Sequence, residues 1–221
     1  MDKTALISMF ITFVASNDVL KYEPHTAGNL ENGRVTSSWN KPKFCNGLDC
    51  PEYKTVKTTK DYEERIYSES RWVSTNLTGI DYKVAQYQMF MKLFKYIGGN
   101  NEGGKKIDMT CPVTDRIIPA QGPACKSNFI MSFYIAPKVT TAPLPKDKTV
   151  YLETKSDLHV YVRQFGGFTD DFEAWRKHAE ELGIALRNDG LAYEEAYYFT
   201  AGYDAPFKLF NRHNEIWFLK K

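Results

Sequence analysis

Apolar and polar positions alternate along much of the chain after residue 50, which is the pattern of half-buried β-strands. Aromatic and β-branched residues, which favour strands, are frequent in these runs. Two longer stretches instead repeat apolar residues at the spacing of an α-helix. The pattern predicts helices over 81–97 and 169–187, and strands over 53–58, 62–67, 71–77, 109–118, 128–135, 149–153, 158–165, 193–203 and 214–219.

The order of these elements repeats along the chain. Residues 61–136 and 149–221 both run strand, helix, strand, strand, and a proline-rich connection over 137–145 separates them. The last strands of the two halves even begin alike, with Asn128-Phe129-Ile130 and Asn214-Glu215-Ile216. We therefore expect an α+β fold, a distorted β-barrel in which two sheets from a duplicated βαββ unit combine and two helices pack on them.

The two predicted helices differ in their apolar surface. The second carries one narrow stripe, whereas the first is apolar around most of its circumference, with a polar strip of only Gln88, Lys92 and Lys95. A helix on a sheet needs one apolar face, so the surplus must be covered by another segment of the chain, a partner or a flat apolar ligand. The surplus residues of the first helix are Val84, Tyr87, Phe90, Met91 and Phe94.

The N-terminal residues predict export from the cell. One lysine precedes an apolar run over 4–15, and small residues end it, so residues 1–16 are expected to be a signal peptide. Residues 17–50 are rich in Asn, Gly, Ser, Thr and Pro without a sustained period, which predicts a flexible segment that ends at a cysteine turn. The globular domain is expected over 51–221.

Four cysteines, an even number, agree with an oxidising, secreted environment. Cys45 and Cys50 are near enough in sequence to staple a turn, whereas pairing Cys111 with Cys125 strains the reach of a disulfide, so the connectivity stays open. The sequon Asn76-Leu77-Thr78 predicts glycosylation if its asparagine is exposed.

Charge and motifs argue against nucleic-acid binding and catalysis. The net charge is +2 and the basic residues are scattered, so no field attracts nucleic acid or an anionic membrane. HExxH, GxSxG and CxxC are absent from the sequence. The glycine-rich run over 99–106 lacks the Ser/Thr and the strand-to-helix context of a phosphate-binding loop. We expect a binding protein that is not an enzyme.

Four motifs together are specific for a known family. They are the aromatic hairpin over 194–221, Met109-Thr110-Cys111-Pro112-Val113-Thr114, Tyr62-Glu63-Glu64-Arg65 and Gln164-Phe165-Gly166-Gly167-Phe168. In this order they resemble the SOUL heme-binding protein family over about residues 51–221. The resemblance implies the barrel-like fold with two helices. It also implies non-enzymatic binding of heme or a related tetrapyrrole, which the protein would carry or buffer.

The resemblance also implies a place for the ligand, a shallow apolar groove between the first helix and the loop of the final hairpin. Lys208 and Arg212 of that loop would meet the heme propionates. The groove residues that the resemblance implies on the helix are Tyr87, Phe90, Met91, Leu93 and Phe94.

Two family positions differ in this chain. Tyr87 stands where the family has an arginine, and Ile66 stands where some members have a proposed axial histidine. His213 in the final loop is the remaining candidate iron ligand, and an exposed loop histidine is the alternative. These differences also favour a second hypothesis, an interaction module that keeps the fold but uses its aromatic helix face on a protein or lipid partner.

Overall fold

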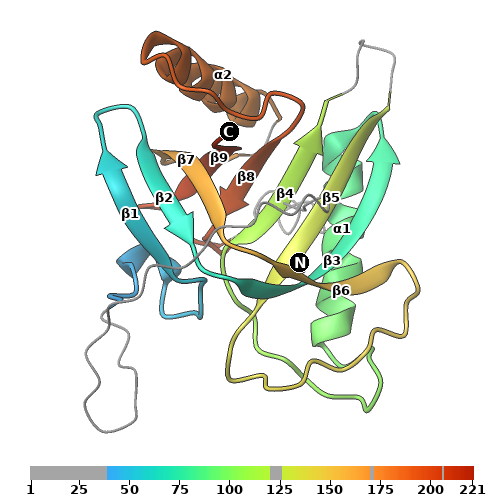
Figure 1. The fold of residues 1–221 in the computed structure, drawn as a ribbon. Coiled ribbons are helices and arrows are strands. Elements are labelled where there is room, and N and C mark those ends of the chain that lie inside the picture. The colour runs from blue at the N-terminus through green and yellow to red at the C-terminus, as the bar shows by residue number, and fades with distance from the viewer. Residues whose placement is uncertain (1–38, 120–125, 170–171, 206) are drawn as a thin grey trace, which may run out of the picture.

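The structure is a computed structural model that describes residues 39–119, 126–169, 172–205 and 207–221. Within these residues the chain forms one curled antiparallel sheet with two α-helices and a short 3-10 helix, Lys43–Cys45 (Figure 1). The helices are α1 (Tyr82–Ile97) and α2 (Phe172–Asn188). The strands are β1 (Tyr53–Thr58), β2 (Glu63–Tyr67), β3 (Ser70–Gly79), β4 (Val113–Ile118), β5 (Ser127–Ile135), β6 (Val150–Lys155), β7 (Leu158–Phe165), β8 (Tyr198–Gly202) and β9 (Asn214–Leu219).

The strand order β1-β2-β7-β9-β8-β4-β5-β3-β6 contains the predicted duplication. The unit β3-α1-β4-β5 and the unit β7-α2-β8-β9 have the same internal order and meet where β4 pairs with β8. The strand that precedes each unit, β2 or β6, pairs with the edge of the other unit. The α+β fold is therefore confirmed, and the sheets of the two units combine into one continuous, curled half-barrel sheet.

Both helices cover the same face of this sheet. Their buried residues belong to one core, and the ring of Tyr82 at the start of α1 lies 4.7 Å from that of Phe172 at the start of α2. A second core on the opposite face contains Trp217, against which residues 39–50 pack through Trp39, Phe44 and other apolar side chains. One face of the sheet is therefore covered by the two helices, and the other is covered by residues 39–50.

Several predicted boundaries differ from the structure. The strand expected from residue 109 begins at Val113, since Pro112 has no N–H to give to the sheet. The strand expected over 193–203 covers only Tyr198–Gly202. The predicted signal peptide and residues 17–38 lie outside the described residues. Neither described helix combines the length and apolar content that crossing a lipid bilayer requires.

Candidate functional site

The helix α1 buries more of its apolar surface than its sequence suggested. It packs against both β3 and β5, so a wide arc of its circumference faces the core. Leu93 is fully buried and Phe90 is 5% exposed, with its ring 5.4 Å from that of Phe133 on β5. These two residues, predicted to line the ligand groove, serve the core of the protein itself.

The rest of the predicted helix residues remain accessible. Phe94 is 49% exposed, and Tyr87 and Met91 are half-buried. The ring of Phe94 stacks on that of Phe90 at 5.6 Å. We call Tyr87, Met91 and Phe94 the aromatic flank of α1, since they continue the apolar surface of the core out to solvent.

Phe94 of the aromatic flank and Tyr96 lie on opposite sides of α1. Tyr96 donates a hydrogen bond of 2.8 Å from its hydroxyl to the carbonyl oxygen of Pro143, in the connection that leads from β5 to β6. Residues two apart on a helix project about 200° apart. Phe94 therefore projects from the side of α1 opposite Tyr96.

The strand register places the start of the final loop, residues 203–213, level with the middle of α1. Phe133 pairs with Val113, which pairs with Gly202, the last residue of β8. The loop thus starts level with the Phe90–Phe133 contact and about two strand spacings, roughly 10 Å, from it. Ala205 in this loop packs on the helix-side core. Part of the loop that the family resemblance pairs with α1 therefore packs on the same face of the sheet as the helix.

Lys208 does not extend toward the aromatic flank. Its ammonium forms a short ion pair with Asp204, whose side chain is fully buried, and it donates a hydrogen bond of 3.1 Å to Asn46. Asn46 also donates to Asp204 at 2.8 Å. Lys208, predicted to meet a propionate, instead neutralises a buried carboxylate and ties the loop to the N-terminal turn.

Arg212 is likewise occupied inside the loop. It is 6% exposed, donates to the carbonyl oxygens of Lys208 and Ala205 at 2.8 and 3.2 Å, and lies over the ring of Phe168. Because one nitrogen of Arg212, Nη1, donates to two backbone carbonyls of its own loop, this side chain sets the shape of that loop. The predicted propionate role of Arg212 does not agree with this placement.

These polar anchors leave an apolar tip on the final loop. Phe207, Leu209 and Phe210 are 82%, 63% and 79% exposed. Large apolar side chains that gather in solvent mark a surface for binding. The sequence analysis missed this tip, although three apolar residues in a predicted loop were the signal for it.

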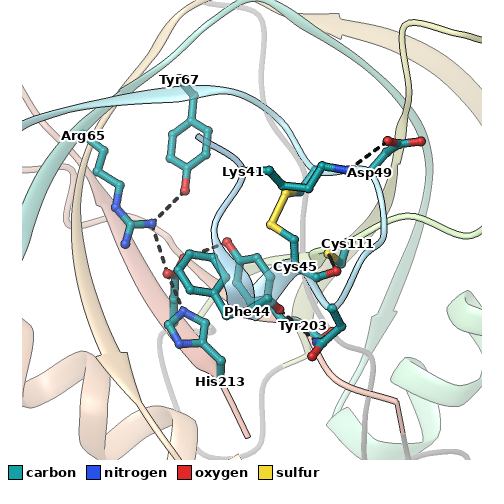
Figure 2. The surroundings of a disulfide bond; sticks show 12 residues. Lys41, Phe44, Cys45, Asp49, Arg65, Tyr67, Cys111, Tyr203 and His213 are labelled. Carbon is teal, nitrogen blue, oxygen red and sulfur yellow. Dashed lines mark hydrogen bonds and ion pairs between the residues drawn. A yellow bond between two sulfur atoms is a disulfide. The ribbon is translucent and has the colours of Figure 1, made fainter. Parts of the chain in front are cut away.

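His213 lies on the face of the sheet opposite the helices. Its ring stacks on Phe44 at 3.9 Å, and its Nε2 lies 2.7 Å from Oε1 of Glu215 (Figure 2). The ring also makes an edge contact with Tyr203, a member of the second core. We predicted that His213 would be an iron ligand at the groove or, alternatively, an exposed loop residue. Its ring is instead half-buried and packed against Phe44.

Glu215 is the centre of a buried polar network that the sequence analysis missed. It accepts hydrogen bonds from Arg65, Tyr203 and Trp217 at 3.0, 2.9 and 2.7 Å. Burial alone raises the pKa of Glu215, but the charge of Arg65 and the bonds from His213 and Trp217 outweigh it and lower the pKa to about 2. The signal was strand alternation, which puts Glu215 on the same face as Trp217.

The described cysteines form one disulfide and leave one free thiol. Cys45 and Cys50 form a disulfide beside the final loop, while Cys111 is a buried thiol and not a disulfide partner (Figure 2). Burial raises the pKa of Cys111 to about 12, which keeps it protonated at neutral pH. Cys125 lies outside the described residues. Asn76 is exposed on β3, which leaves its sequon accessible.

Comparison with known proteins agrees with this architecture. The family model described as SOUL heme-binding protein matches residues 48–219. Heme-binding protein 2 of Homo sapiens is 39% identical over 163 residues, 72% of this chain and 78% of the relative. Heme-binding protein 1 of Xenopus laevis is 31% identical over 81% of this chain and 96% of the relative.

A solved structure shares the fold at low identity. The EcmrR–DNA complex aligns with a TM-score of 0.55 at 10% identity, over 76% of this chain and 58% of that chain. At this identity the likeness concerns the fold alone. The family match extends over the sheet, both helices and the final loop. This chain belongs to the SOUL heme-binding protein family.

Proposed function

We propose that this protein binds heme or a related tetrapyrrole as a carrier or buffer, without catalysis, and that the macrocycle lies against the aromatic flank of α1. Family membership supports heme as the ligand. The observation that carries the location is Phe94, which is 49% exposed on α1 beside the core residue Phe90. A flat apolar ligand covers such a surface well.

The binding is proposed to rest on apolar contacts. Each histidine that the structure describes has a ring nitrogen near a carboxylate: His159 at Glu64, His178 at Glu181, and His213 at Glu215. None of the three belongs to α1 or to the apolar tip of the final loop. We therefore assign them no role as axial ligands, and the proposed affinity comes from burying the macrocycle between Phe94 and that tip.

A hemin titration tests the function and the location separately. Phe94→Asp removes an apolar contact worth about 1.5–3 kcal/mol and adds a charge, so it should weaken hemin binding about tenfold or more. Ile184→Asp is the matched control, because Ile184 is 52% exposed on α2. Absorbance in the Soret band and quenching of tryptophan fluorescence report binding.

The outcomes separate the two claims. Saturable binding by the wild type that Phe94→Asp weakens and Ile184→Asp leaves unchanged supports both. Equal weakening by the two variants would refute the location, and a wild type without saturable binding would refute the function. Lys208→Glu is not a suitable probe, since it places a second carboxylate beside buried Asp204.

The apolar tip of the final loop favours a second candidate function, interaction with a protein or lipid partner. Its three large side chains are more exposed than Phe94 is. This candidate gains support if the wild type binds no hemin while Phe207→Ser with Phe210→Ser abolishes retention of the protein on lipid vesicles. Vesicle binding that the double substitution leaves unchanged would refute a role for the tip.

We also propose that the protein is secreted. The apolar N-terminal run, the Cys45–Cys50 disulfide and the exposed Asn76 support this location. Expression of the full chain in animal cells should yield protein in the medium whose electrophoretic mobility changes on glycosidase treatment. Asn76→Gln should abolish that change, and retention of the wild type inside the cells would contradict secretion.

A further inference from the structure

Three sulfur atoms gather where the N-terminal turn meets the sheet. Among the residues that the structure describes, the Sγ atoms of Cys45, Cys50 and Cys111 lie within 4.8 Å of one another. Their residues are 1%, 6% and 0% exposed. The Cys111 thiol donates to the carbonyl oxygen of Cys45 at 3.3 Å, and its backbone N–H donates to that of Asp49 at 3.0 Å. The third sulfur is thus held beside the disulfide by two contacts with the same turn.

We propose that reduction of the Cys45–Cys50 disulfide converts these three sulfurs into a binding site for a thiophilic metal ion, with Cu(I) preferred. A dithiol supplies two electrons and two protons to the disulfide and is itself oxidised to a disulfide, which leaves three protein thiols. The metal ion then displaces a proton from each sulfur that it binds. In an oxidising compartment the disulfide keeps the site closed.

The spacing of the sulfurs fits such a site. With a metal–sulfur distance of about 2.3 Å, three sulfurs around a trigonal ion are about 4 Å apart. Cys111 already lies within 4.8 Å of both partners, so the main movement is the separation of Cys45 from Cys50 after their bond is broken. These two cysteines flank a turn in which Asn46 and Gly47 have positive φ, and the turn closes only a short stretch of chain.

The ligand set favours a soft, low-coordinate ion. Among the described residues, no His, Asp or Glu joins the three sulfurs as a further ligand in this cluster. Thiolates select Cu(I) and zinc over harder cations. Zinc completes a tetrahedron with a fourth ligand such as water, and the burial of all three sulfurs opposes the entry of water. Cu(I), which three thiolates can satisfy, therefore suits the cluster better.

Competition for Cu(I) tests this proposal. The protein is reduced with a phosphine under anaerobic conditions and titrated with Cu(I) against a chromophoric Cu(I) chelator. Reduced wild type should remove a single equivalent of copper from the chelator, and the oxidised protein should remove none. Cys111→Ser should lower the affinity of the reduced protein at least about tenfold, because one of its three thiolate ligands is lost. Cys125→Ser, which also removes one cysteine, is the matched control and should bind as the wild type does.

Two results of this titration would refute the Cu(I) site. The proposal is refuted if the oxidised protein binds Cu(I) as well as the reduced one does, or if Cys111→Ser and Cys125→Ser behave alike. Should Cys111→Ser fail to fold, X-ray absorption of the copper-loaded wild type decides. Three sulfur neighbours support the site, whereas a shell that contains nitrogen or oxygen overturns it.

Discussion

Replacing Glu215 with glutamine removes a fully buried carboxylate that faces the fully buried guanidinium of Arg65 at 3.0 Å. The exchange keeps the size of the side chain but leaves the charge of Arg65 with only Glu63 as an acidic partner among the described residues. An unpaired buried charge is costly, and breaking such a pair typically destabilises a protein by about 3–5 kcal/mol. Since Glu63 still compensates in part, we expect the lower end of this range.

The pKa of Glu215 gives a second estimate of how much its carboxylate contributes to the free energy of folding. Its pKa is lowered from 4.5 to about 2, and each unit corresponds to about 1.4 kcal/mol. The carboxylate therefore contributes about 3.5 kcal/mol to folding at neutral pH. Because the pKa is lower in the folded protein, this contribution is complete above about pH 4.5 and is lost as the pH falls through about 2.

Urea unfolding followed by tryptophan fluorescence measures both effects. At about pH 7, Glu215→Gln should lower the free energy of unfolding by about 3 kcal/mol, and this deficit should shrink as the pH falls below about 4.5. Glu180→Gln is the control, because Glu180 pairs with Arg176 on the exposed face of α2 and should change stability by less than about 0.5 kcal/mol. A deficit below about 1 kcal/mol for Glu215→Gln, or one that is independent of pH, would contradict the reasoning.

Three further changes test other parts of the fold. Leu93→Ala empties a fully buried position and should cost about 2–5 kcal/mol in chemical unfolding; a cost below about 1 kcal/mol would mean that α1 is not packed as described. Asp81→Ala removes the side chain that caps α1 by accepting from Val84 N–H at 3.1 Å, and should lower the unfolding free energy by about 1 kcal/mol, unless the cap is not formed in solution. Cys45→Ser with Cys50→Ser should cost about 2 kcal/mol, since the disulfide closes a short loop; an unchanged stability after reduction of the wild type would argue against the disulfide.

The sequence by itself determined the elements and their order. Alternation and helical spacing depend only on neighbouring residues, so they located both helices and every strand, with boundaries that differ from the structure by at most five residues. The strand–helix–strand–strand repeat led to the duplicated unit, and four short motifs led to the family. The turn between Cys45 and Cys50 was also a local feature, because the two residues are five apart.

Only the tertiary structure decided what the site residues do. Which arc of α1 is buried depends on β5, whose Phe133 packs on Phe90 and takes it from the predicted groove. Lys208 is bound to Asn46, 162 positions earlier in the chain, and His213 stacks on Phe44. Periodicity sets which side of an element is apolar, but it does not specify which distant segment meets that side. The contacts that fix the final loop therefore became visible only when the N-terminal turn and the last hairpin were placed side by side (Figure 2).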